Sequence, residues 1–252
     1  MPGHPFLDGP RPVPFAHRGG ASDAPENTLA AFARAVDLGY RYLETDVHAT
    51  RDGVLMAFHD ADLSRTCGVD ARIEDLDFAD LRGVRVGGTE PIPTLDEVLG
   101  TWPGTMVNID CKSDRAVAPL IARLRDGDAL DRTCIGSFSD RRLAAIRDEF
   151  GSRVCTSCGP REIALLRAGS WLGRAGRTSA HAAQVPVRQG PITILDRRFV
   201  DVAHRAGLHV HAWTIDDPLE MQRLLDLGVD GIMTDRPAVL LDVLKSRGAW
   251  PA

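Results

Sequence analysis

The feature that most constrains this chain is a regular alternation of short apolar segments and amphipathic segments along almost its whole length. The apolar segments predict buried strands, and apolar residues at three- and four-residue spacing predict helices between them. The predicted strands are 13–17, 41–47, 105–110, 133–137, 153–156, 180–185, 208–213 and 231–234. The predicted helices are 28–38, 94–99, 115–125, 140–150, 161–167, 196–206, 218–227 and 237–246. Eight such units in 252 residues predict one α/β domain, a closed (β/α)8 TIM barrel over residues 12–248.

One interval breaks this alternation, between the second predicted strand and the helix expected at 94–99. It opens with the sequence TRDGVLMAFHD, in which Asp52 and Gly53 supply a hairpin turn. The remainder, residues 61–93, predicts a small insertion at the mouth of the barrel. Inserted loops at that end usually shape the access of substrate.

Composition and charge exclude several classes of protein. The net charge of −5 gives no basic surface of the kind that nucleic-acid binding requires, so a small-molecule partner is expected. No apolar stretch approaches the roughly 18 to 20 residues of a transmembrane helix, and the proline-rich N-terminus lacks a signal-peptide core. We therefore expect a cytoplasmic protein without stable membrane insertion, and the oligomeric state is left open. Five scattered cysteines favour reduced thiols over a zinc site.

Acidic side chains lie at the ends of the second and third predicted strands. Because strand side chains alternate, Glu44 and Asp46 share one face, and Asp110 and Lys112 share one face of the next strand. The carboxyl ends of barrel strands form the active-site face, so these three carboxylates are expected to converge on one divalent cation, Mg2+ or Ca2+. The alternative is that the acids only form ion pairs with Lys112 and Arg18.

Two histidines follow the first strand and the hairpin. His17 ends the first predicted strand and His59 ends the hairpin, so both are expected to flank one cavity. Cleavage of a phosphodiester needs one group that accepts a proton and one that donates a proton. Two histidines suit these roles, because the pKa of histidine lies near neutral pH. The other histidines are weaker candidates.

The spacing of these residues resembles a known family. The motifs are HRG at 17–19, PENT at 25–28, ExD at 44–46, HD at 59–60, NIDCK at 108–112, and HAWTID and GVDGIMTD near the C-terminus. Together they resemble the glycerophosphodiester phosphodiesterase family over nearly the whole chain. The resemblance implies a metal-dependent TIM-barrel hydrolase that releases sn-glycerol 3-phosphate and an alcohol from a glycerophosphodiester.

The resemblance also implies roles for individual residues. The positions that match are His17 and His59 as acid and base, Arg18 and Lys112 on phosphate, and Glu44, Asp46 and Asp110 on the metal. Asp110 departs from the family, which usually has glutamate there. The ligand at this position is therefore one methylene shorter.

Other residues have two interpretations each. Trp213 either lines a pocket for glycerol or a choline-like group or only packs, and Gln184 either donates to substrate or only shapes a turn. Asn27 is expected to cap the first helix, while Glu26 either orders its loop or approaches the site. Asp235 is expected to be a helix-start acid and not a catalytic group.

Two rival functions remain. One is a lysophospholipase D acting on lysophospholipids, which a longer apolar groove in the insertion would favour. The other is a non-catalytic barrel that binds phosphodiesters, which the loss of His17 or His59 would indicate. Both histidines are present.

Overall fold

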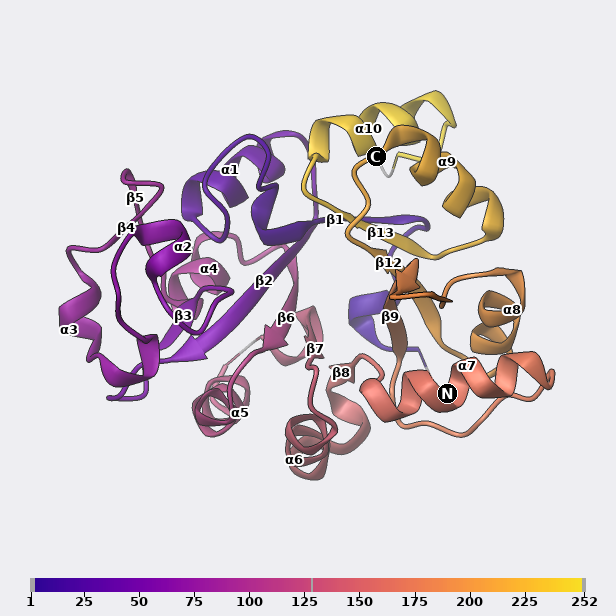
Figure 1. Cartoon of the computed structure of the whole chain (residues 1–252), viewed down its shortest axis with the longest axis horizontal. Coiled ribbons are helices and arrows are strands. Elements are labelled where there is room, and N and C mark those ends of the chain that lie inside the picture. Colours follow the sequence, from indigo (N-terminus) through magenta and orange to yellow (C-terminus); the bar gives the residue numbers. More distant parts are fainter. Residues whose placement is uncertain (1–2, 128, 251–252) are drawn as a thin grey trace.

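The eight predicted strands form a nearly closed parallel barrel in the computed structural model, which describes residues 3–127 and 129–250 (Figure 1). They are β1 (Val13–Ala16), β2 (Tyr42–Ala49), β6 (Met106–Cys111), β7 (Thr133–Gly136), β8 (Cys155–Thr156), β9 (Ala182–Pro186), β12 (His209–Trp213) and β13 (Gly231–Thr234). The strands pair in the order β8-β7-β6-β2-β1-β13-β12-β9, and a parallel bridge between Ser157 and Ala182 joins the two ends. The predicted (β/α)8 barrel is confirmed, with strand ends that differ by up to two residues.

Helices between the strands cover the outside of the barrel (Figure 1). They are α1 (Leu29–Asp37), α4 (Leu95–Thr101), α5 (Val117–Arg125), α6 (Asp140–Phe150), α7 (Pro160–Trp171), α8 (Arg197–Arg205), α9 (Pro218–Leu227) and α10 (Pro237–Ser246). Thr94 and Glu97 form a capping box at the start of α4. The expectation that Asn27 caps α1 is wrong, because the Thr28 side chain accepts the hydrogen bond from the Ala31 N–H.

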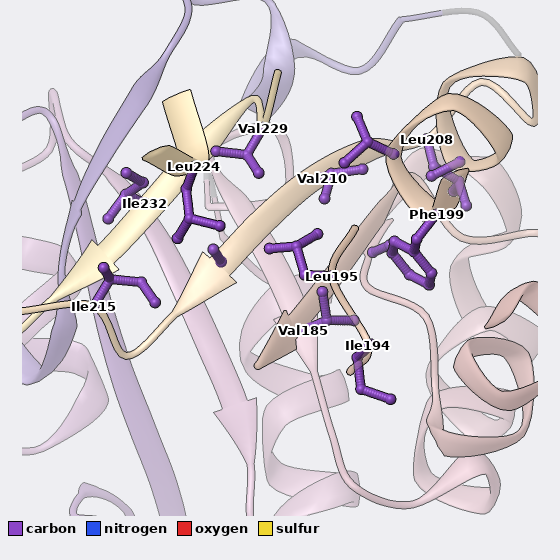
Figure 2. Close-up of a cluster of buried hydrophobic side chains, with 14 of the residues drawn as sticks. Val185, Ile194, Leu195, Phe199, Leu208, Val210, Ile215, Leu224, Val229 and Ile232 are labelled. Atoms are coloured by element: carbon purple, nitrogen blue, oxygen red, sulfur yellow. The ribbon is translucent and has the colours of Figure 1, made fainter. Parts of the chain in front are cut away.

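The apolar faces of the helices pack on the outer face of the barrel. Figure 2 shows part of the largest buried cluster, which includes Phe199 of α8, Leu224 of α9, Val210 of β12 and Ile232 of β13. None of these four side chains is more than 1 % exposed. Burial of each contributes about 1.5–3 kcal/mol of transfer free energy. This packing fixes the strands and therefore the side chains at their ends.

The N-terminal segment closes one end of the barrel. The 3-10 helix η1 (Pro5–Leu7) places the fully buried Phe6 against Phe15 and Tyr42, with ring centroids 6.3 and 5.4 Å apart. The Tyr42 hydroxyl, at the first residue of β2, donates a hydrogen bond to the Phe6 carbonyl at 2.9 Å. Tyr42 is the first residue of β2, so η1 covers the end of the barrel where the strands begin. The opposite end, where the strands finish, is the open one.

The insertion after β2 is a packed subdomain. β3 (Leu55–Ala57) pairs antiparallel with the end of β2, as the hairpin turn predicted. It is followed by α2 (Ser64–Cys67), η3 (Ile73–Asp75), α3 (Phe78–Leu81), β4 (Arg85–Val86) and β5 (Glu90–Pro91) (Figure 1). Met56, Phe58 and Leu63 belong to its own buried cluster. The predicted insertion is confirmed, and it forms a wall beside the end of β2.

The cysteines and the helices of the structure bear on the predictions from composition. All five cysteines are free thiols. Across residues 3–127 and 129–250, no helix is both long enough and apolar enough to cross a bilayer. The cytoplasmic location and the absence of a nucleic-acid partner stay predictions.

Candidate active site

Acidic side chains gather at the carboxyl ends of β2 and β6. Glu44 lies opposite Asn108 and Asp46 lies opposite Asp110 in the parallel pairing, so these side chains project to one side of the sheet. Glu44 and Asp46 are only 4 % and 1 % exposed. Carboxylates buried on neighbouring strands need compensating positive charge.

Asp46 has three partners. Its Oδ1 lies 2.9 Å from Lys112 Nζ, and its Oδ2 accepts a hydrogen bond from Asn27 Nδ2 at 2.9 Å. The same Oδ2 lies 3.2 Å from Arg18 Nε. Burial alone would raise the pKa of Asp46, but the charges of Lys112 and Arg18 outweigh it and lower the pKa. Asp46 therefore anchors the two cations that are predicted to bind phosphate.

Asp110 has one bound and one unbound oxygen. Its Oδ2 accepts a hydrogen bond from Lys112 Nζ at 2.7 Å, so Lys112 bridges Asp110 and Asp46. Its Oδ1 is buried and has no hydrogen-bond partner among the described residues. A buried oxygen without a partner is energetically costly, and a cation or a donor at this position would relieve that cost.

Glu44 faces β1. Its Oε2 accepts a hydrogen bond from the Arg18 backbone N–H at 3.0 Å and lies 3.8 Å from His17 Nε2. Burial and the charge of Asp46 raise the pKa of Glu44 to about 7. The positive charge around Glu44 therefore compensates its carboxylate only in part.

The predicted convergence of Glu44, Asp46 and Asp110 on a metal is partly present. Within the described ranges, no group of three or more His, Cys, Asp or Glu side chains has the arrangement of a metal site. Lys112 lies between Asp46 and Asp110, which is the ion pairing that the alternative interpretation predicted. Two observations nevertheless fit a cation: the partnerless Oδ1 of Asp110 and the raised pKa of Glu44.

His17 lies directly after β1, in the short helix η2 (His17–Gly19), between two acids. Its Nδ1 lies 2.7 Å from Asp235 Oδ1, and its Nε2 faces Glu44. Burial would lower the pKa of His17, but the charge of Glu44 and the hydrogen bond to Asp235 outweigh it and raise the pKa. Asp235 follows β13, so residues from both neighbours of β1 hold this imidazole.

His59, which follows β3, is held in a matching way. Its Nδ1 lies 2.6 Å from Asp60 Oδ1, and Asp60 Oδ2 accepts a hydrogen bond from Arg65 Nε at 2.5 Å. Burial would raise the pKa of Asp60, but the hydrogen bonds from Arg65 and His59 lower it to about 2. Asp60 therefore stays ionised. With Nδ1 engaged in both histidines, Nε2 is the nitrogen available to exchange protons.

Glu26 joins Arg18 to the insertion. Arg18 Nη1 donates a hydrogen bond to Glu26 Oε1 at 2.9 Å, and Arg65 donates two hydrogen bonds to the same carboxylate at 2.6 and 2.9 Å. Burial would raise the pKa of Glu26, but the Arg65 hydrogen bonds and the charge of Arg18 lower it. Of the two interpretations of Glu26, these contacts favour the acid that orders its loop.

Trp213 and Gln184 lie at different depths of the open end. Trp213 meets Phe138 edge to face with ring centroids 5.7 Å apart, and Phe138 is 65 % exposed. Lys112 Nζ lies 5.6 Å from the centroid of Phe138, so this aromatic pair borders the carboxylate cluster. Gln184 Nε2 donates a hydrogen bond to Asn108 Oδ1 at 2.7 Å, which holds its amide against β6.

Two residues of the site were missed by the sequence interpretation. The view of Asp235 as only a helix-start acid is incomplete, because its carboxylate binds His17. Asp235 directly follows β13 and Phe138 comes soon after β7. The rule that functional residues follow barrel strands would have identified both.

Known proteins are similar to this chain over most of its length. The model of the glycerophosphoryl diester phosphodiesterase family matches residues 17–239. A Mycobacterium tuberculosis protein named probable glycerophosphodiester phosphodiesterase 2 is 38 % identical, covering 94 % of this chain and 92 % of its own. A Mus musculus protein named lysophospholipase D GDPD1 is 27 % identical, covering 93 % of this chain and 87 % of its own.

Solved structures share the barrel. A Silicibacter pomeroyi protein ascribed to the same family has a TM-score of 0.83 at 24 % identity, covering 99 % of this chain and 100 % of its own. An Oleispira antarctica phosphodiesterase, solved with its product sn-glycerol-3-phosphate, has a TM-score of 0.78 at 24 % identity, covering 93 % and 97 %. Fold, site and relatives together define a phosphoric diester hydrolase built on a TIM barrel. The chain belongs to the glycerophosphoryl diester phosphodiesterase family, as its motifs predicted.

Proposed function

We propose that this protein hydrolyses glycerophosphodiesters to sn-glycerol 3-phosphate and an alcohol, with a divalent cation as cofactor. The observation that carries the proposal is the pair His17 and His59, each held at Nδ1 by a carboxylate at the same end of the barrel. Acid–base cleavage of a phosphodiester needs two such groups and positive charge for the phosphate. The names of the relatives and the product bound to the Oleispira antarctica enzyme support this substrate class.

Glu44, Asp46 and Asp110 would hold the cation. Carboxylate oxygens are the ligands that Mg2+ and Ca2+ prefer, so either ion suits this set. The partnerless Oδ1 of Asp110 and the raised pKa of Glu44 indicate where positive charge is lacking. When bound, such an ion neutralises charge on the phosphoryl oxygens.

The remaining chemistry belongs to the side chains of this chain. Arg18 offers a planar fork of N–H donors and Lys112 a compact ammonium group to the phosphate oxygens. One histidine accepts a proton at Nε2 from the attacking oxygen, and the other donates a proton from Nε2 to the departing alcohol oxygen. The attacking oxygen belongs either to water, which gives glycerol 3-phosphate directly, or to a neighbouring glycerol hydroxyl, which gives a cyclic phosphate that water then opens. Asp235 and Asp60 keep the two imidazoles in position throughout.

The relative named as a lysophospholipase D favours a second candidate function. A lysophospholipid would need an apolar groove for its acyl chain near the site. The cavity that adjoins Lys112 is instead lined mainly by charged and polar residues. We therefore propose water-soluble glycerophosphodiesters as the main substrates. Both histidines are in place, which disfavours a barrel that only binds.

Release of glycerol 3-phosphate tests the proposal. With Mg2+ or Ca2+ present, we expect release from glycerophosphocholine, glycerophosphoethanolamine or glycerophosphoglycerol. Lysophosphatidylcholine is expected to be the poorest substrate of the panel. Faster cleavage of lysophosphatidylcholine than of every glycerophosphodiester would support the second function, and no cleavage of any substrate would contradict both.

We expect Asp235→Asn to lower kcat about tenfold or more, the usual scale for loss of a partner that orients a functional histidine. The amide keeps the shape but removes the charge that, together with that of Glu44, raises the pKa of His17. The limb of the pH–rate profile that His17 governs should therefore move to lower pH. Asp242→Asn, on the exposed face of α10, is the matched control and should leave both kcat and the profile unchanged. A wild-type profile in Asp235→Asn would show that the contact with His17 has no positioning role.

A further inference from the structure

A cavity adjoins the candidate active site at Lys112. Its volume is about 400 Å3, and it lies between the end of β2, the insertion and the segment after β6. The insertion contributes Arg72 and Glu74 to its lining, and α6 contributes Arg142. Lys112 belongs both to this lining and to the carboxylate cluster of the site. The cavity therefore borders one of the residues that are proposed to bind the phosphate.

The lining carries an excess of positive charge. Four lining residues are arginine or lysine, and two are acids. Arg72 donates two hydrogen bonds to Glu74, at 2.6 and 3.0 Å. Arg142 donates a hydrogen bond to Asp114 at 2.8 Å. These two pairs neutralise both acids of the lining.

These pairs leave two lining cations over, and because Lys112 binds Asp46 and Asp110, Arg115 is the one without an acidic partner among the described residues. It is exposed, and it lies in the 3-10 helix η4 (Asp114–Ala116) that follows β6. In the part of the chain that the structure describes, no residue forms a hydrogen bond or an ion pair with its guanidinium. Its five N–H donors are therefore available to a ligand in the cavity.

Apolar surface is scarce in this cavity. Ala61 is the single aliphatic residue among the described residues that line it. An acyl chain would find little apolar surface here, and a trimethylammonium group would find no Trp, Tyr or Phe face among the described residues that line the cavity. Hydroxyl and phosphate oxygens would instead meet guanidinium donors. The volume lies within the roughly 300–1,000 Å3 of small-molecule sites.

On the basis of the proposed function, we propose that this cavity binds the alcohol part of the substrate and selects alcohols rich in hydroxyl or phosphate oxygens. A phosphodiester held by Arg18 and Lys112 carries two substituents. Lys112 lies next to Phe138, which contacts Trp213, and it also lines the cavity. The aromatic pair and the cavity are two separate surfaces, so each substituent of the phosphate can contact one of them. The preferred substrates are then glycerophosphodiesters of polyols and not those of quaternary ammonium alcohols.

Charge reversal at Arg115 tests this assignment. For Arg115→Glu, we expect kcat/KM on glycerophosphoinositol to fall about tenfold, the scale of one hydrogen bond to a charged group. On glycerophosphocholine, kcat/KM should rise or change by less than about threefold, since an acid attracts its cationic group. Arg161→Glu, on the exposed face of α7 and outside this cavity, is the matched control and should leave both values unchanged. An equal loss on both substrates, or no change on either, would overturn the assignment.

Binding measurements separate this assignment from the proposed function. If the wild-type protein cleaves no glycerophosphodiester at all, the proposed function fails. In that case, or if it cleaves neither of these two substrates, the cavity is tested by titration calorimetry with glycerophosphoinositol. Binding about tenfold weaker in Arg115→Glu than in the wild type would then support the cavity on its own. Equal binding by the two proteins, or no binding by the wild type, would overturn it.

Discussion

We expect His17→Ala and His59→Ala each to lower kcat about 100-fold or more, the usual scale for removal of a positioned acid or base. Each imidazole is held at Nδ1 by a carboxylate, which leaves Nε2 to exchange a proton with substrate. Alanine removes that nitrogen, while Arg18 and Lys112 remain to bind phosphate. The measurement is kcat at saturating substrate, together with thermal unfolding of each variant.

The control for both variants is a histidine at the other end of the strands. His204 pairs with Asp230 at 2.7 Å, and Asp230 directly precedes β13. His204→Gln should therefore keep a kcat close to that of the wild type, even if its thermal unfolding changes. A near wild-type kcat in His17→Ala or His59→Ala would remove that histidine from the acid–base pair.

The barrel was predictable because each of its strands and helices is determined by the residues within that element. Each strand and helix is specified by the spacing of its own apolar residues, and connections between parallel strands have one favoured hand. The same alternation assigned Glu44, Asp46 and Asp110 to the face on which they lie. Fold and candidate ligands therefore follow from one pattern.

Contacts between distant segments were not predictable in this way. Asp235 and His17 are 218 positions apart and meet only because β13 and β1 are neighbours in the barrel. Locally, Asp235 stands two residues before Pro237 of α10, where an acid has an ordinary role at a helix start. The sequence around Asp235 therefore indicated a role at the helix start and gave no sign of its contact with His17.

The sequence also does not show which of several possible partners a polar side chain binds. Asn27 has the residue type of a helix cap, but its φ is 56° and its amide binds Asp46 and Thr45. Thr28, one residue later, caps α1 instead. The sequence offered Lys112 both as a phosphate ligand and as an ion-pair partner of the strand acids, and in the fold its ammonium lies between Asp46 and Asp110. Residue type fixes what a side chain can bind, and only the folded barrel determines which partner it meets.

Removal of divalent cations is the second change with a large expected effect. Exhaustive chelation should abolish release of glycerol 3-phosphate, and Mg2+ or Ca2+ should restore it, because the phosphate needs neutralisation beyond Arg18 and Lys112. The pKa of Glu44, raised to about 7 by burial and by Asp46, indicates that positive charge compensates this carboxylate only in part. Full activity of the metal-free enzyme would contradict the proposed cofactor.

Two variants of Asp110 separate the effect of its charge from the effect of its side-chain length on metal binding. Asp110→Asn removes the charge and keeps the shape, so we expect a strong loss of metal affinity. Asp110→Glu keeps the charge and has the longer side chain usual in the family, so we expect substantial activity with a changed preference between Mg2+ and Ca2+. Titration of activity with each metal measures both effects. If Asp110→Asn binds metal and turns over substrate like the wild type, Asp110 only balances Lys112, and the cation must be held by Glu44, Asp46 and other ligands.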